Sequence, residues 1–130
     1  LAFIEELFER AADGAAVKAG LMQLTRMVHS PERSKLRRSR AATIGLSQHQ
    51  PELAAALAEE QRRANEVMGR AIEGAMARGL IDSAFDPNAI GMMFQSIALG
   101  LVLADVDPVS APSNPAWEQL VSRLLDTIVR

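Results

Sequence analysis

Apolar side chains recur every three or four residues along nearly the whole chain, the spacing that places them on one face of an α-helix. Proline, glycine and capping residues divide this pattern into six segments. The predicted helices are Leu1–Ala12, Ala15–His29, Glu32–Leu46, Pro51–Gly79, Pro87–Ala104 and Ala116–Val129. No stretch alternates with the period of two that a β-strand would show. The pattern therefore predicts an all-α domain of six helices.

Two dipeptides mark helix starts with particular clarity. In Asp86-Pro87 and Asn114-Pro115 the polar side chain can accept the unpaired amide hydrogens of the first turn, while proline presets the first helical dihedral. The segment Asp105–Ser113 contains two prolines and is predicted to be a loop. It is long enough to let the last two helices pack side by side.

Composition places the chain among ordinary globular domains. Its 130 residues suit a single domain spanning residues 1–130, and 48% apolar with 23% charged residues argues against disorder. With no cysteine and only His29 and His49, disulfides, thiolate metal sites and most zinc sites are excluded. The longest apolar stretch, Ile97–Ala104, is far short of the ~20 residues that cross a bilayer. We expect a soluble, cytoplasmic protein with no membrane contact and no cofactor.

The net charge of −2 lacks the positive field of an isolated nucleic-acid binder. The first residue is Leu1 rather than Met, and the apolar stripe of the first helix begins there. We therefore expect the chain to be part of a longer protein.

The fifth and sixth helices carry more apolar surface than one core needs. Ile90, Phe94 and Leu101 lie on one side of the fifth helix, but its other side is also apolar, which is typical of a helix buried on two sides. Contiguous apolar surface of this kind marks interfaces. We predict a two-fold homodimer through residues on these two helices, namely Met92, Leu99, Leu103, Trp117, Leu120, Leu124 and Ile128. The alternative is that both are core helices of a monomer.

The segment Arg78–Leu103 resembles the TetR family of transcriptional regulators. A long helix ends at Gly79, a short acidic turn ends in Asp-Pro, and an apolar helix containing a Gly-Leu pair follows. The segment Gln48–Gly79 is similar to the central helix of the family's regulatory domain. The two segments cover about half of the chain.

This resemblance implies a C-terminal regulatory domain of a transcriptional repressor. It implies a ligand cavity among the helices, and a dimer in which the last two helices of each chain form a four-helix bundle. Operator DNA would be contacted only through an N-terminal helix-turn-helix, which is absent from this sequence. A small-molecule effector would act by shifting the population of two arrangements of the DNA-reading heads.

Candidate effector-binding residues are polar groups on apolar arcs. Gln61 and Asn65 share an arc with Met68 and Ile72, and an amide buried without partners costs on the order of 1 to 3 kcal/mol. These amides could face a cavity, or that arc could be exposed, or they could cap a neighbouring helix. Six methionines also suit a cavity that adapts to apolar ligands, although methionine is a common core filler. The full set of candidates is Met22, Thr25, His29, Arg40, Gln61, Asn65, Met68, Ile72 and Phe94.

Two of these candidates have simpler readings beside the functional one. His29, in the last turn of its helix, would also favour the helix dipole. Arg40 is the one arginine near the apolar stripe of its helix and is a candidate for an anionic effector. Its simpler reading is shared with the rest of the basic run, which spreads around most of the helix and is predicted to be a solvated face that pairs with nearby Glu; the run consists of Arg33, Lys35, Arg37, Arg38 and Arg40.

Enzyme chemistry is not indicated. The central helix's acids lie mostly off its apolar arc, no Glu-x-x-His occurs, and no glycine-rich phosphate loop or nucleophile elbow is present. We predict a non-enzymatic protein. The rival functions are a dimerisation module without a ligand and, more remotely, a bundle that sequesters a ligand without regulating DNA.

Overall fold

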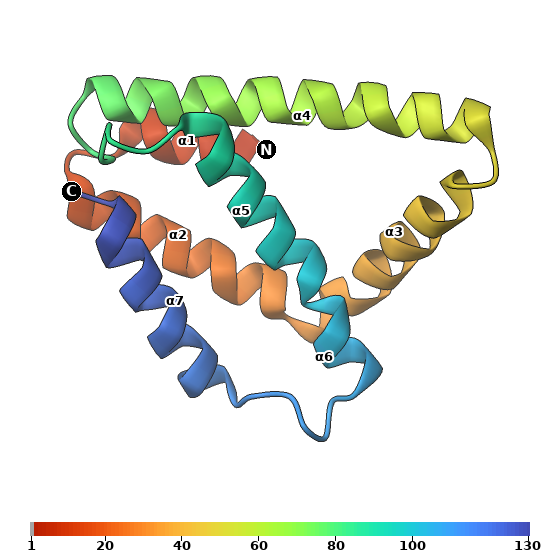
Figure 1. The fold of residues 1–130 in the computed structure, drawn as a ribbon. Coiled ribbons are helices and arrows are strands. Elements are labelled where there is room, and N and C mark those ends of the chain that lie inside the picture. The colour runs from red at the N-terminus through yellow and green to blue at the C-terminus, as the bar shows by residue number, and fades with distance from the viewer. Residues whose placement is uncertain (1) are drawn as a thin grey trace.

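The computed structural model describes residues 2–130, and in these residues the chain is all α-helical with no strand (Figure 1). The elements in order are α1 (Ala2–Arg10), α2 (Gly14–His29), the 3-10 turn η1 (Pro31–Arg33), α3 (Ser34–Ser47), α4 (Pro51–Ala77), α5 (Pro87–Gly100), α6 (Val102–Val106) and α7 (Asn114–Ile128). The all-α prediction is confirmed. The part of it that concerns Leu1 lies outside the described residues.

Several predicted boundaries are shifted. The third helix begins with a separate 3-10 turn, and the fifth is interrupted at Leu101 before continuing as α6. Asp105 and Val106, predicted to belong to a loop, are therefore helical.

The capping prediction is confirmed for α5 and wrong by one residue for α7. Asp86 Oδ1 accepts a hydrogen bond from the amide of Ala89 at 2.8 Å. In α7 the hydroxyl of Ser113 accepts from the amide of Ala116 at 3.3 Å, and Asn114 is already the first helical residue. Ser113 fills this role because a cap reaches the amide three residues ahead of it.

The core forms where α1, α2 and α7 meet the C-terminal half of α4. Its most deeply buried side chains come from three helices and the loop after α4. They are Val17, Ile72, Ile81 and Leu125. The C-terminus joins this core through backbone hydrogen bonds from Asp82 to Ile128 and from Arg130 to Leu80. The buried residues of α4 all lie between Met68 and Ala75, so its N-terminal half projects beyond the core (Figure 1).

Helices α3, α4 and α5 form three sides of an open triangle (Figure 1). The α3–α4 corner is a turn of the chain. At the α4–α5 corner the helices pack closely, since a Cβ added at Gly91 would lie 2.8 Å from Cγ of Met68. The third corner, where α3 meets α6, has no chain connection, and side chains hold it together.

The expectation that the last two helices pack side by side is wrong within one chain. Helix α7 packs against α2, and α5 faces α7 across a cavity. The connection after α6 is long enough to carry the chain away from α5.

One helical span in the described part of the chain, Pro87–Val106, is long and apolar enough to cross a membrane by length and composition alone. The unbroken apolar stretch Ile97–Ala104 forms only the C-terminal part of this span. Gln95 and Ser96 interrupt the apolar residues of the span without lowering its mean hydropathy below that of a membrane helix. Core helices of soluble proteins satisfy the same criteria.

Candidate effector-binding groove

A groove of about 430 Å³ lies inside the triangle of α3, α4 and α5. Its size falls within the roughly 300 to 1,000 Å³ typical of small-molecule sites. The face that α5 turns toward it repeats at helical spacing, and consists of Met92, Gln95, Ser96 and Leu99. The opposite wall, on η1 and α3, consists of Arg33, Leu36, Arg37, Arg40 and Ile44.

Three amide side chains meet where α4 crosses α5. Gln61 Nε2 donates to Asn65 Oδ1 at 2.8 Å and to Gln95 Oε1 at 2.6 Å. Gln95 Nε2 in turn donates to Asn65 Oδ1 at 3.0 Å. Two of the three, Gln61 and Gln95, line the groove. This amide cluster explains why polar side chains occupy apolar arcs of both helices, because each satisfies the others' hydrogen bonds.

Arg40 joins α3 to the amide cluster through long contacts. Its Nη2 lies 3.4 Å from Gln61 Oε1, and its Nη1 lies 3.7 Å from a carboxylate oxygen of Glu60. The side chains of Arg40 and Glu60 are 47% and 62% exposed, so this ion pair is screened by solvent and weak. The guanidinium of Arg40 therefore lies beside the amide cluster, and its two contacts there are long and weak.

Arg37 is held much more tightly, in a buried ion pair with Asp105 of α6. Its Nε and Nη2 donate to the two carboxylate oxygens at 3.0 and 2.8 Å, and its Nη1 donates to the carbonyl of Val28 at the end of α2. The two side chains are only 8% and 9% exposed. The prediction that Arg37 belongs to a solvated face is wrong, because α6 carries an acid to it that the sequence placed in a loop.

The electrostatics of Asp105 follow from this geometry. Hydrogen bonds from the Arg37 guanidinium lower the pKa of the carboxyl below its ordinary value of 3.8, against the opposing effect of burial. A hydrogen bond from Ser34 acts in the same direction. The pair is thus charged at neutral pH, and it closes the α3–α6 corner of the triangle.

Two further cavities lie on the other side of α5. One of about 70 Å³ sits in the core and includes Thr25 and Phe94 in its lining. One of about 300 Å³ lies between the end of α2, α6 and the start of α7, and includes His29 and Trp117. The rings of these two residues meet edge to face, with centroids 6.0 Å apart. The indole Nε1 of Trp117 is buried without a hydrogen-bond partner among the described residues.

The structure distributes the predicted effector residues over different environments. Arg40 and Gln61 line the groove, and Asn65 supports it through the amide cluster. Thr25, His29 and Phe94 line the other two cavities, and the Thr25 hydroxyl donates to the carbonyl of Leu21 within its own helix.

Three predicted effector residues belong instead to the core. Met68 and Ile72 are buried, and Met22 packs against the core cluster. None of the three lines any of these cavities. The arc of α4 that Met68 and Ile72 share with the amides Gln61 and Asn65 runs from the core toward the groove, so only its N-terminal part faces a ligand-sized space.

Sequence reasoning missed Gln95 and Ser96. A signal was available, because they are the only strongly polar side chains between Ile90 and Val102 on an otherwise apolar helix. They lie on the groove face of α5.

The predicted dimer residues also divide. Four are exposed, as an unpartnered interface requires; they are Met92, Leu103, Leu120 and Leu124. Leu99 and Trp117 are half-buried. Ile128 is only 6% exposed in the core of a single chain, so its assignment to a dimer surface is wrong. Met92 and Leu99 line the groove, which gives these side chains a place within one chain.

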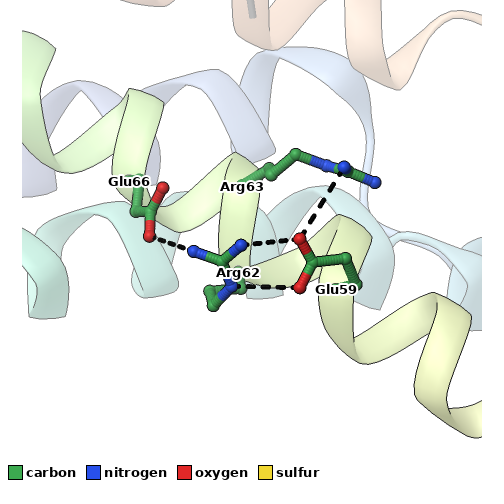
Figure 2. Close-up of polar contacts among 4 residues, drawn as sticks. All are labelled: Glu59, Arg62, Arg63 and Glu66. Atoms are coloured by element: carbon green, nitrogen blue, oxygen red, sulfur yellow. Dashed lines mark hydrogen bonds and ion pairs between the residues drawn. The ribbon is translucent and has the colours of Figure 1, made fainter.

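Glu59 and Glu66 of α4 do not line the groove, whereas Glu60 of the same helix reaches Arg40 on α3. Glu59 and Glu66 pair with Arg62, at 2.6 and 2.5 Å, and Glu59 lies 3.7 Å from Arg63 (Figure 2). Hydrogen bonds from Arg62 lower the pKa of Glu59 below its ordinary value. The carboxylate of Glu59 is thus stabilised in the charged form on a solvated surface, which is unsuited to acid–base catalysis.

Comparison with models of known families, with curated proteins and with solved structures finds no match for this chain.

Proposed function

We propose that this chain is the effector-binding and dimerisation domain of a TetR-type transcriptional repressor, acting on operator DNA through a separate N-terminal module. The observation that carries effector binding is the groove of about 430 Å³, which combines an apolar lining with a few converging polar groups. The long α4 followed by the apolar α5 agrees with what the resemblance of Arg78–Leu103 to the family implies.

Ligand binding would be transmitted through α4. The groove is bounded by its N-terminal half, whereas α1 packs against the same helix near the core. A ligand that favours one spacing of α3, α4 and α5 shifts the population toward that spacing by no more than its difference in affinity for the two states. A change in α4 then reaches α1, the helix that would connect to the DNA-reading head.

A thermal-shift screen tests effector binding. The screen should span neutral, anionic and cationic small molecules, because a ligand at 100 times its Kd stabilises the fold by about 2.7 kcal/mol. Ser96→Trp places a large side chain in the groove and is expected to abolish the shift. Ala58→Trp is the matched control, because Ala58 is exposed on α4 outside the groove lining. A shift that survives Ser96→Trp would exclude the groove as the site.

A second candidate function is a dimerisation module without a ligand. It is favoured by the exposed apolar side chains of α6 and α7, among them Leu103 at 74% and Leu120 at 56% exposure. The absence of a thermal shift with every class of compound, together with a stable dimer, would favour this candidate over the first.

Dimerisation is tested by light scattering at micromolar concentration. Leu103→Glu and Leu120→Glu are expected to convert a dimer to a monomer, because each would bury a charge at the interface. Val109→Glu is the control, since Val109 is 94% exposed in the loop between α6 and α7. A wild-type monomer, or equal effects of all three substitutions, would contradict the proposed interface.

A further inference from the structure

The α3 wall of the groove carries positive charge that no acid in the lining offsets. Arg33, Arg37 and Arg40 are spaced three or four residues apart and all face the groove, while none of the described residues that line it is acidic. Arg37 is neutralised by Asp105 from outside the groove. Arg40 has only the long, solvent-screened pair with Glu60, which lies outside the groove lining, so its charge and that of Arg33 remain available to a bound molecule.

Arg40 has the geometry to receive an anion. A guanidinium offers five N–H donors, and the contacts of Arg40 with Gln61 and Glu60 are long, at 3.4 and 3.7 Å. The amide nitrogen of Gln61 is already engaged by Asn65 and Gln95. The cluster therefore holds the Gln61 carbonyl oxygen near Arg40 and leaves the remaining guanidinium donors to another acceptor.

The rest of the lining suits a hydrocarbon. Leu36 and Ile44 on α3 face Met92 and Leu99 on α5, and the flexible thioether of methionine adapts to apolar molecules of different shape. Leu36 is 60% and Met92 47% exposed. Covering these apolar side chains would contribute to the affinity of a ligand that lies along the groove.

We infer that the groove binds an aliphatic molecule with a single anionic head group, the head on Arg40 and the hydrocarbon between α3 and α5. This inference rests on the proposed function, in that the groove is taken to be the effector site. It adds the chemical class of the effector. An arginine fork fits carboxylate and phosphate oxygens equally well, and a carboxylate is used for the test.

The experiment compares three probes with the same hydrocarbon chain by isothermal titration calorimetry, below their micelle-forming concentrations. The probes are decanoate, decan-1-ol and decyltrimethylammonium. Decanoate is expected to bind at least about tenfold more tightly than the alcohol, because a charge-assisted hydrogen bond adds to the same apolar contact. The cation should bind the most weakly of the three.

Variants locate the head group. Arg40→Met is expected to weaken decanoate about tenfold and to leave decan-1-ol unchanged, because the apolar length of the side chain is kept. Arg63→Met is the matched control, since Arg63 lies on the outer face of α4 and should leave the binding of both probes unchanged (Figure 2). Circular dichroism of each variant checks that the helices are intact.

A chain-length series tests the apolar half of the inference. From hexanoate to decanoate the affinity should rise about fourfold for each methylene group, the equivalent of fully burying it. Raising the salt concentration should weaken decanoate and spare the alcohol, because the contact with Arg40 is exposed enough to be screened.

The outcomes separate this inference from the proposed function. Equal binding of decanoate and decan-1-ol, or no effect of Arg40→Met, would overturn the anionic head group while leaving the groove a small-molecule site. A different result is that none of the three probes binds, whereas other compounds stabilise the wild type but not Ser96→Trp. The inferred class of ligand would then be wrong, and the groove would stand as the binding site. If no compound of any class binds, both fail.

Discussion

The buried ion pair between Arg37 and Asp105 provides the most sensitive test of the structure. It closes the only corner of the α3, α4 and α5 triangle at which the chain itself makes no connection. Asp105→Asn keeps the size of the side chain and removes its charge, which leaves the guanidinium of Arg37 buried with only neutral hydrogen-bond acceptors, among them the carbonyl of Val28.

The expected loss can be estimated from the burial of the pair. Removing one partner of a buried pair costs about 3 to 5 kcal/mol, and exposed fractions of 8% and 9% place this pair in that class. For a domain of this size, about 3 kcal/mol corresponds to a fall in melting temperature of roughly 10 °C. The double substitution Arg37→Met with Asp105→Leu should recover most of the loss, because no charge is then left buried.

The assay is thermal unfolding followed by circular dichroism across a range of pH. The folded-state pKa of Asp105 is below its ordinary value of 3.8, so the pair's contribution is fully present above that value. It is lost as the pH falls toward the folded-state pKa. The difference between wild type and Asp105→Asn should therefore be constant above about pH 5 and shrink below pH 4.

Two results would refute this reasoning. A loss of less than about 1 kcal/mol for Asp105→Asn would mean that the pair is solvated, since exposed pairs contribute at that level. A difference that persists unchanged at pH 3 would mean that the charge of Asp105 is not responsible. Glu66→Gln on the outer face of α4 is the control and should leave the melting temperature essentially unchanged (Figure 2).

Other predictions concern packing and capping. Gly91→Val should destabilise the fold by about 1 to 3 kcal/mol in chemical denaturation, because a Cβ there would lie 2.8 Å from Cγ of Met68. Gly100→Ala should be neutral or stabilising by up to about 1 kcal/mol, since nothing lies within 4 Å of the added carbon; equal losses for both would contradict the close α4–α5 contact. Asp86→Ala should cost about 1 kcal/mol through loss of the cap on α5. Asn114→Ala should cost clearly less than Ser113→Ala in the same assay, and the reverse order would restore Asn114 as the cap of α7.

The regular part of the fold could be predicted from the sequence because it depends on local spacing. The periodic apolar residues and the Asp86-Pro87 cap located the helices to within a few residues. The break at Leu101 has no such signal, because apolar residues continue at helical spacing on both sides of it. The packing of α7 against α2 is likewise a tertiary choice that periodicity does not encode.

The groove was only partly predictable for a related reason. Gln61 and Asn65 stood out as polar residues on an apolar arc, but their partner Gln95 lies 34 and 30 positions from them in the chain. Arg37 looked like one member of a basic run, and its burial depends on Asp105, 68 positions away. Contacts between side chains so far apart in the sequence can be identified only when the packing of the helices is known.

The uneven packing of α4 gives the helix the mechanical character of a lever. Its buried residues begin at Met68, while the helix extends back to Pro51, about 25 Å away at 1.5 Å per residue. A tilt of about 5° about the buried part would move the N-terminal end, which the turn after Ser47 joins to α3, by roughly 2 Å. The groove is lined by Gln61 in the N-terminal half of α4, whereas α1 packs against the same helix near the core. A displacement of α4 at the groove is therefore expected to reach α1 as a smaller displacement.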